Sequence, residues 1–330
     1  MARAGPKCFQ ANFQEPSQLT KTEHTAVIGA GLAGLTCARA LADAGHSVVV
    51  FDKGRGLGGR MASRRKGGWR FDHGAVVLRP TDDTFAAFLA SEHDAGHADA
   101  WTAATGWSGV PGMSTVVKSL ARGLEIVSSQ RVTGLSKTDA GWKIDGPQDA
   151  EDLIFDGVIL AIPHPQAQEI LMPWPALLAQ IAKAQMQPCW TLMAGFGAPL
   201  ATDIAYSDHC AHPISVIARE TAKPGRNLPG DGWVIQANAD WTRSHLELAQ
   251  SQIEALLLTA FFKEIACAPV TPAISMAHRW RYALTEMPLG QPYVMDASLG
   301  LAACGDWCLG HTAQAAFDSG RSLAAAIIAG

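Results

Sequence analysis

The sequence has few charged residues and no excess of positive ones. Lys and Arg number 26 against 30 Asp and Glu, so the formal net charge is −4, and charged residues make up 17% of the 330-residue chain. A protein that binds nucleic acid or anionic lipid through its overall charge would need a basic surplus. We therefore expect neither nucleic acid nor a membrane as a partner. The 48% hydrophobic content allows a large buried core.

Cysteine is sparse and follows no regular spacing: seven residues, an odd number, are scattered from Cys8 to Cys308. Small secreted proteins pair closely spaced cysteines, so this distribution predicts a reducing, cytoplasmic location. The first residues contain no apolar segment like that of a secretory signal, and no apolar run is long enough to span a bilayer. Residues 1–24 are polar, and we expect them to form a poorly ordered extension.

The most informative segment, TAVIGAGLAGLTCARALADAGHSVVVFDK, covers residues 25–53. It contains a short apolar strand, the spacing Gly29-x-Gly31-x-x-Gly34, a helix, and a second strand that ends at Asp52. Gly29 would permit a tight turn, Gly31 would let a pyrophosphate approach the backbone, and Gly34 would let helix and strand pack closely. Asp52 would accept hydrogen bonds from a ribose diol. The complete pattern predicts a dinucleotide-binding site.

A second glycine-rich loop follows directly, with the sequence RGLGGR from Arg55 to Arg60. A plain NAD-binding domain would continue here with another helix and strand. Such a loop can extend along a longer cofactor, with Arg60 neutralising diphosphate charge. It could equally be a solvated basic loop, because Arg64, Arg65 and Lys66 come shortly after it. The residues alone favour neither interpretation.

Several further motifs accompany these two loops: DKGRGLGGRM, FDHGA, PGMS, VILAIPHPQA, KPGR, AHRW and the late CGDWC. Together they resemble the flavin-containing amine oxidase superfamily, and within it the renalase-like branch, especially its bacterial members. The resemblance extends from about Thr25 to the carboxyl terminus. It implies FAD, held non-covalently, as the cofactor.

The resemblance also implies which residues would contact FAD. Asp52 would bind the adenosine ribose, Arg55 and Arg60 would flank the phosphates and the ribityl chain, and Gly74 and Ala75 would lie near the flavin. The backbone at Val132 would meet the adenine. The full implied set is Gly29, Gly31, Ala33, Gly34, Asp52, Lys53, Arg55, Gly59, Arg60, Met61, Gly74, Ala75, Val132, Gly305, Asp306, Gln314 and Ala315.

Cys304 and Cys308 flank the late Gly305–Asp306 pair. The resemblance makes Asp306 the functional residue here, because the pair would touch the ribityl-diphosphate part of FAD. A zinc site would need about four ligands, and no second pair of suitable spacing is present. A redox pair more often has the spacing C-x-x-C. We therefore expect no metal site, and cysteines that act only in packing.

The implied fold is α/β: a Rossmann-like FAD-binding domain, with a parallel sheet and a β-meander, beside a smaller α+β substrate domain. Both would be discontinuous. The FAD-binding part would take residues 25–80, 110–165 and 272–330, and the substrate part residues 81–109 and 166–271. The run DGVILAI predicts a buried parallel strand, LEIVSSQRVTGLSKTDAGWKIDG a meander, and SQIEALLLTAFFKEIA and SGRSLAAAIIAG two helices.

The renalase-like resemblance implies an oxidoreductase that oxidises dihydronicotinamide isomers of NAD(P)H. The flavin would take a hydride, and O2 would accept the electrons to give H2O2. No Ser-His-Asp set, HExxH motif or paired carboxylates stand out, and hydride transfer to flavin needs none. Catalytic residues stay unassigned, and His278 is expected to be a core histidine. The candidates for the substrate pocket are Trp190, Arg219, His245, Arg279 and Trp280, with Arg226 as a further phosphate-binding arginine.

Two other functions stay open at this point. The same flavin could oxidise a true amine or another CH–NH donor, although amine oxidases usually surround the amine with aromatic side chains and the sequence has only three tyrosines. The protein could also bind FAD for structure or sensing without turnover. The segment before the PGMS turn is shorter than in relatives, and residues 311–317 depart from the usual pattern, which keeps this last alternative open.

Overall fold

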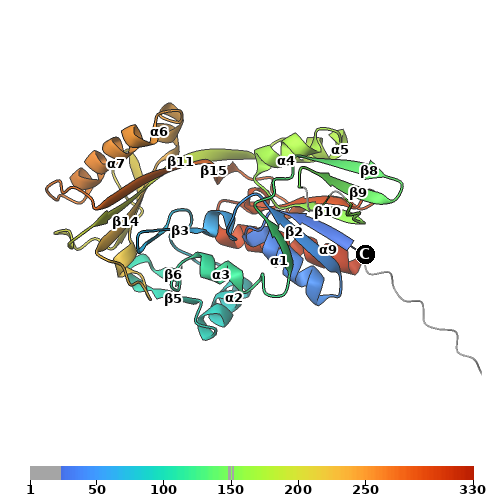
Figure 1. Ribbon diagram of the computed structural model, residues 1–330, viewed down its shortest axis with the longest axis horizontal. Helices are drawn as coiled ribbons and strands as arrows, with labels where there is room; N and C mark the ends of the chain where they lie inside the picture. Colours follow the sequence, from blue (N-terminus) through green and yellow to red (C-terminus); the bar gives the residue numbers. More distant parts are fainter. Residues whose placement is uncertain (1–23, 148–149, 151) are drawn as a thin grey trace, which may run out of the picture.

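A computed structural model describes residues 24–147, 150 and 152–330. The extension expected before His24 lies outside the described residues. Figure 1 shows two lobes, with the long strands β11 (Gln185–Phe196) and β15 (Ile274–Met287) running from one toward the other. Each lobe is organised around its own sheet, as expected for the α/β fold with two domains.

The first lobe contains a six-stranded sheet with the order β16-β17-β10-β1-β2-β7. Every pairing in it is parallel except that of the edge strand β16 with β17. The expected Rossmann-like parallel sheet is therefore confirmed. Its strands are β1 (His24–Ile28), β2 (Ser47–Asp52), β7 (Glu125–Ser128), β10 (Gly157–Leu160), β16 (Tyr293–Asp296) and β17 (Leu301–Cys304).

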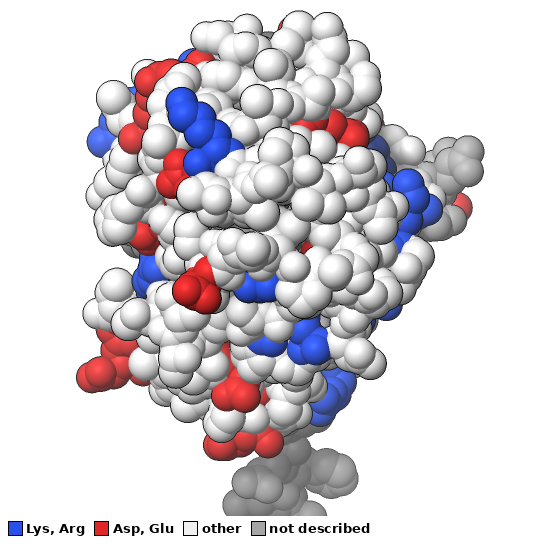
Figure 2. All heavy atoms as spheres, turned by 90° about the vertical axis from the view of Figure 1, so that its left-hand side faces the viewer, with Lys and Arg blue, Asp and Glu red and all other residues white. Residues whose placement is uncertain are grey.

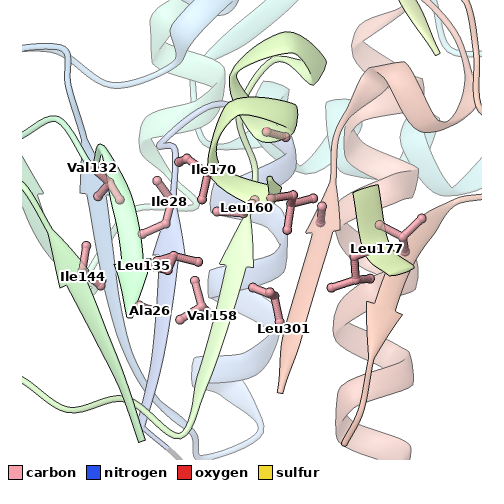
Figure 3. Close-up of a cluster of buried hydrophobic side chains, with 14 of the residues drawn as sticks. Ala26, Ile28, Val132, Leu135, Ile144, Val158, Leu160, Ile170, Leu177 and Leu301 are labelled. Atoms are coloured by element: carbon pink, nitrogen blue, oxygen red, sulfur yellow. The ribbon is translucent and has the colours of Figure 1, made fainter. Parts of the chain in front are cut away.

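Both faces of this sheet are covered, which explains why its strands are apolar on both sides. On one face, strand residues pack against the hairpin of β8 (Gly134–Thr138) and β9 (Gly141–Asp145) and against α4 (His164–Leu171) and α5 (Pro175–Ile181), as Figure 3 shows. On the other face lie α1 (Leu32–Asp43) and α9 (Ala313–Ala329). These two helices approach so closely that a Cβ on Gly320 would lie 2.2 Å from the carbonyl oxygen of Ala33.

The second lobe contains a five-stranded antiparallel sheet with the order β12-β13-β14-β11-β15. Its further strands are β12 (Tyr206–Ser207), β13 (Ile214–Arg219) and β14 (Asp231–Ala237). The helices α6 (Ala239–Ser244) and α7 (Gln250–Glu264) cover its outer side (Figure 1). The opposite side packs against the hairpin of β3 (Ser63–Lys66) and β4 (Trp69–Asp72). This sheet therefore has one face toward α7 and one toward the first lobe.

The remaining elements connect the lobes or border them. They are the short helices η1 (Gly59–Met61), η2 (Thr102–Ala104) and η4 (Glu220–Ala222), the helices α2 (Asp83–Asp94), α3 (Ser114–Lys118) and α8 (Asp306–Leu309), and the hairpin of β5 (Ala98–Trp101) and β6 (Gly106–Gly109).

Two of the expected domain limits differ from the sheets. β15 was placed in the FAD-binding part by the limit at residue 272, but it pairs along most of its length with β11 of the second sheet. α2 was placed in the substrate part, but its Phe85 and Leu89 pack in the same core cluster as α1 and α9. Both differences arise from contacts between segments far apart in sequence.

The surface agrees with the low charge of the sequence. Figure 2 shows the end of the molecule that Figure 1 places on the left, where α7 and β14 lie, and on this face Lys and Arg are interspersed with Asp and Glu rather than gathered in one basic area. Within the described ranges, no helix combines the length and the apolar character needed to cross a bilayer.

A buried group of four charged side chains, the Asp72 network, joins the two lobes. Lys223 Nζ lies 3.0 Å from Asp72 Oδ2 and 2.7 Å from Glu220 Oε1, and Arg226 pairs with both carboxylates. All four side chains are at most 1% exposed. Burial alone would raise the pKa of Asp72, but Lys223 and Arg226 lower it to about 2, while burial raises the pKa of Glu220. Asp72 also accepts hydrogen bonds from Ser63 and the Met113 amide.

Replacing Lys223 by methionine would leave the two buried carboxylates with one cation. We expect Lys223→Met to lower the free energy of unfolding by about 3–5 kcal/mol, the usual consequence of breaking a buried ion pair from one side. Chemical denaturation measures this. The matched control is Lys143→Met on β9. The side chain of this exposed lysine forms no hydrogen bond or salt bridge with a described residue, so the change should alter stability by less than about 0.5 kcal/mol. Equal losses in both variants would contradict the inference that Lys223 balances the charge of the two buried carboxylates.

Candidate dinucleotide and substrate site

The turn between β1 and α1 has the geometry that the glycine pattern predicts. Gly29 has φ of +114°, a left-handed conformation that favours glycine, and a Cβ there would lie 2.4 Å from the carbonyl oxygen of Ala161. A Cβ on Gly34 would lie 2.0 Å from the carbonyl oxygen of Gly29. Packing within the chain therefore requires both glycines.

Gly31 is different, because no contact with the described residues requires it to be glycine. Its φ of −81° suits any residue, and a Cβ there would meet no atom within 4 Å. It stands at the amino-terminal end of α1, a 12-residue helix whose free backbone amides and dipole favour negative charge. A diphosphate seated in this open space would explain the glycine, so the turn fits a dinucleotide.

Asp52 ends β2 beside this turn, and the backbone fixes its carboxylate. Oδ2 accepts a hydrogen bond from the Ala30 amide at 2.7 Å, and Oδ1 accepts one from the Gly54 amide at 2.6 Å. The amide of Gln130 bonds to the Asp52 carbonyl at 3.0 Å, which brings the segment before Val132 to the same edge. The remaining lone pairs of the carboxylate can accept from ribose hydroxyl groups.

The second glycine-rich loop crosses the first turn. The Gly58 amide donates to the Ala30 carbonyl at 2.8 Å, and a Cβ on Gly59 would lie 3.7 Å from Gly31 Cα. Met61, at the end of η1, is buried, whereas Lys53 and Arg55 are exposed at the start of the loop. The two loops therefore form one continuous surface, as a cofactor longer than a mononucleotide requires.

Arg60 and Asp306, separated by 246 positions, form a two-pronged ion pair. Arg60 Nη1 lies 2.7 Å from Asp306 Oδ2 and also donates to the Ala283 carbonyl at 3.1 Å, and Thr285 Oγ1 donates to Asp306 at 2.9 Å. Burial alone would lower the pKa of Arg60, but the Asp306 carboxylate raises it. The sequence assigned each residue separately to the cofactor. The structure brings them together, so that each neutralises the other.

A third turn, at Gly74 and Ala75, lies against Arg60. The Ala75 amide donates to the Arg60 carbonyl at 2.8 Å, and a Cβ on Gly74 would lie 2.0 Å from that oxygen. From β14, Gln236 Nε2 donates to the Gly74 carbonyl at 2.6 Å. The predicted glycines of both loops, Arg60, Asp306 and this turn are thus connected through direct contacts.

Three rings adjoin Gly74 and form what we call the His73 cluster: His73, His278 and Trp280. Their ring centroids are 4.9, 5.1 and 4.4 Å apart, and Trp280 Nε1 donates to the His73 carbonyl at 2.8 Å. Burial, and then His278, lower the pKa of His73 to about 4; burial, and then Arg64, lower the pKa of His278. His73 Nδ1 is buried, and no described residue forms a hydrogen bond with it. Both histidines are therefore neutral at neutral pH.

Four of the predicted pocket residues do not join the His73 cluster. Residues directly opposite on paired strands share a face, so Trp190 and Arg279 share one face, and Thr191 and His278 share the other. Trp190 packs in the hydrophobic core between the second sheet and α7, which we call the α7 core. Arg279 lies above the Trp190 ring and forms an ion pair with Glu247.

The other two predicted residues also have partners in the second lobe. Arg219 is paired with Asp231 at 2.7 Å and lies over the ring of Trp233, which packs in the α7 core. His245 stacks on Trp241, with 4.2 Å between ring centroids. Of the predicted pocket residues, the structure places Trp280 in the His73 cluster. Arg226 belongs to the Asp72 network, so it is not available to substrate phosphates.

The carboxyl-terminal predictions fall at two helix starts. The side chain of Gln314 bonds to Thr81 and Asp82, so Gln314, like Ala315, could contact a cofactor only through its backbone.

The cysteines on either side of Gly305 and Asp306 are buried thiols. Cys304 contacts Cys37, and this contact and then burial raise its pKa; burial raises the pKa of Cys308. The two thiols pack in different core clusters. Among the described residues, no three His, Cys, Asp or Glu side chains are grouped as metal ligands.

The sequence missed His73, His278 and Gln236. His73 directly precedes the predicted Gly74 in the FDHGA motif, so its place was available, but its contact with β15 was not. His278 was assigned to the core. Gln236 has no signal in the sequence, because its role depends on the pairing of β14 with β11.

Comparisons with known proteins agree with this geometry. Residues 27–91 match the family model of the NAD(P)-binding Rossmann-like domain. The amino-terminal segment therefore has a Rossmann-like fold. A 4,4'-diapophytoene desaturase of Staphylococcus aureus (strain Newman) is 43% identical over 65 residues, which are 19% of this chain but only 13% of the desaturase. The match to these curated relatives thus spans about an eighth of their length.

Solved structures resemble the chain over nearly its full length. A proposed protoporphyrinogen oxidase from Exiguobacterium sp. 255-15 has a TM-score of 0.68 at 14% identity, covering 94% of this chain and 99% of that one. Cyclohexylamine oxidase from Brevibacterium oxydans IH-35A has a TM-score of 0.67 at 15% identity, covering 93% and 99%. At these identities the likeness shows the fold, which is shared across both lobes.

The two glycines of the first helix should respond differently to alanine. Gly31→Ala should weaken FAD binding while changing the stability of the cofactor-free protein by less than about 1 kcal/mol, since its Cβ meets no protein atom. Gly34→Ala should cost about 1–3 kcal/mol or more even without cofactor, because of the clash with Gly29. FAD titration and denaturation of the cofactor-free protein measure the two effects. Equal destabilisation by both would contradict an open site beside Gly31.

The lowered pKa of His73 predicts a pH-dependent stability. Because the unfolded chain takes up a proton near pH 6.5 and the folded chain only near pH 4, the free energy of unfolding should fall as the pH drops between these values. The full effect is at most about 3 kcal/mol. His73→Gln should flatten this slope, whereas His209→Gln, at a side chain 96% exposed, should retain it. An unchanged slope in His73→Gln would contradict a buried, neutral His73.

Proposed function

We propose that the protein is an FAD-dependent oxidoreductase of the amine oxidase or desaturase type. The observation that carries the proposal is the open space beside Gly31, continued by the second loop toward Arg60 and Gly74. A cofactor with its ribose at Asp52 and its diphosphate at Gly31 would extend along this surface to the His73 cluster. FAD has the length for this path, and its redox ring would end beside the rings of the second lobe.

When bound, FAD would accept a hydride from the substrate and pass the electrons to O2, which gives H2O2. The residues of the chain would bind and orient. The α1 amides would hold the diphosphate, and Asp52 the ribose. Gln236 and the Arg60 carbonyl fix the Gly74 turn from opposite lobes. Trp280, tethered to the His73 carbonyl, would form a flat wall for the substrate, and the neutral His73 ring would pack beside it.

We further propose a dihydronicotinamide isomer of NAD(P)H as the substrate, as the renalase-like resemblance implies. A flat nicotinamide ring suits the Trp280 wall. Arg64 is exposed and unpaired among the described residues, and its charge reaches both histidines of the His73 cluster. A positive charge there would attract the phosphates of a dinucleotide and repel an alkylammonium. Arg64 thus takes the role first assigned to Arg219, Arg226 and Arg279.

Oxidation of an amine is the second candidate. One structure that shares the fold is named a cyclohexylamine oxidase, and the neutral histidines would tolerate an amine in its uncharged form. A sensor without turnover is the third. Both would share the FAD site with the first candidate, so the substrate decides between them.

Anaerobic mixing of the FAD-loaded protein with candidate reductants tests the substrate. We expect rapid bleaching of the flavin by dihydronicotinamides whose hydride lies at positions other than 4 of the ring. Ordinary NADH should reduce it poorly, because its hydride position is the one restored in the product. Bleaching by a monoamine alone would establish the amine oxidase alternative, and no bleaching by any donor would favour the sensor.

Arg64→Gln provides the matched test of charge. It should raise the substrate concentration needed for half-maximal reduction by roughly tenfold, the effect of losing one charge-assisted contact to phosphate. Arg122→Gln, at an exposed arginine after α3, should leave it unchanged. The same value in Arg64→Gln and the unaltered protein would remove Arg64 from the substrate site.

A further inference from the structure

A cavity lies away from the His73 cluster. It has a volume of about 570 Å³ and lies between the turn of the β3–β4 hairpin and the loop at 225–228. Arg65, Lys66, Arg70 and Arg226 line it. Arg65 is paired with Arg70 across the hairpin and Arg64 with Phe71, so Arg65 and Arg70 point to the opposite face from Arg64. The lining of this cavity, which we call the hairpin pocket, includes neither Arg64 nor a residue of the His73 cluster, so it is distinct from the proposed substrate site.

The hairpin pocket carries uncompensated positive charge. Within the described part of the chain, Arg65, Lys66 and Arg70 have no hydrogen bond or salt bridge, and no carboxylate lines the cavity. The charge of Arg226 is balanced by Asp72 and Glu220, but the other three cations have no such partner. Burial, and then repulsion by Arg226 and Arg65, lower the pKa of Arg70. A negative ligand would relieve this repulsion.

Two further features show that Arg226 and Arg70 are held in place. Arg226 is 1% exposed and forms ion pairs through Nε and Nη2 with the two carboxylates, and its buried Nε and Nη1 have no hydrogen-bond acceptor among the described residues. Arg70 lies over Gly112, where a Cβ would be 2.9 Å from Arg70 Cδ. Glycine at that position makes room for the arginine. A fixed arginine beside a buried unsatisfied donor differs from the flexible cations of an ordinary surface.

We propose that the hairpin pocket binds a phosphoryl group of a small anionic molecule. Guanidinium groups in fixed positions match the oxygens of phosphate, and the volume is sufficient for a diphosphate. The source is either free inorganic diphosphate or the diphosphate of a nucleotide, which share this chemistry. The site does not depend on FAD, because none of its residues belongs to the loops that would hold the cofactor.

Calorimetric titration of the FAD-loaded, full-length protein with pyrophosphate and with ADP tests the proposal. Both should bind with one site per chain. Arg70→Gln should weaken both at least about tenfold, the effect of removing a charge-assisted hydrogen bond. Flavin absorbance should stay constant, which separates this site from that of the cofactor. Tighter binding of ADP than of pyrophosphate would assign the nucleotide as the source, and equal binding the inorganic anion.

Arg122→Gln is the control, since it removes one exposed arginine elsewhere and should bind both probes like the unaltered protein. Arg65→Gln should weaken binding as Arg70→Gln does. The proposal is overturned if neither probe binds, or if the control loses as much affinity as Arg70→Gln. It is also overturned if binding releases flavin, because the anion would then occupy the cofactor site.

Discussion

The ion pair of Arg60 with Asp306 is the interaction on which the candidate site depends. Its arginine belongs to the second glycine-rich loop, its carboxylate to the start of α8, and Thr285 and the Ala283 carbonyl add contacts from β15. The Arg60 carbonyl also holds the Gly74 turn through the Ala75 amide. Arg60 and its ion pair thus connect the second glycine-rich loop with three other segments: α8, β15 and the Gly74 turn. Without the Arg60–Asp306 ion pair, the loop beside Gly31 would no longer be held in place. The same interaction therefore supports both the cofactor site and the contact between the two lobes.

The Asp72 network is the second interaction that joins the two lobes. It fixes the β3–β4 hairpin between the lobes, because Asp72 bonds to Lys223 and Arg226 on one side and to the Met113 amide on the other. Phe71 and Trp69 of the same hairpin pack against the second sheet. Ions so deeply buried contribute little net stability beyond well-packed apolar side chains, but they tolerate few alternative arrangements. We expect such a network to determine the relative orientation of the lobes more than the free energy of their contact.

How much the sequence could predict depends on the distance between interacting residues. The β1–α1–β2 unit was predicted correctly because each signal is local: Gly29 turns, Gly34 packs and Asp52 ends a strand within one short segment. The pairing of β11 with β15 joins segments far apart, so the side on which Trp190 and Arg279 lie could not be read from alternation alone. The same holds for the Arg60–Asp306 pair and for His73, whose neighbours come from β15. The FAD contacts remain predictions. The structure adds that the loops predicted to make these contacts lie against one another.

The sequence alone does not show which arginines are neutralised by carboxylates in the folded protein. In the sequence, Arg60, Arg219, Arg226 and Arg279 were candidates for contacts with phosphate, and the run from Arg64 to Lys66 left it open whether the second glycine-rich loop is a solvated basic loop. In the structure, carboxylates hold the first four arginines. Among the described residues, the cations of the β3–β4 hairpin have no hydrogen-bonded or ion-paired side-chain partner, and the hairpin directs Arg64 to one face and Arg65 and Arg70 to the other. An arginine can bind a ligand only where the fold has not already neutralised it, and this hairpin keeps its positive charge on both sides.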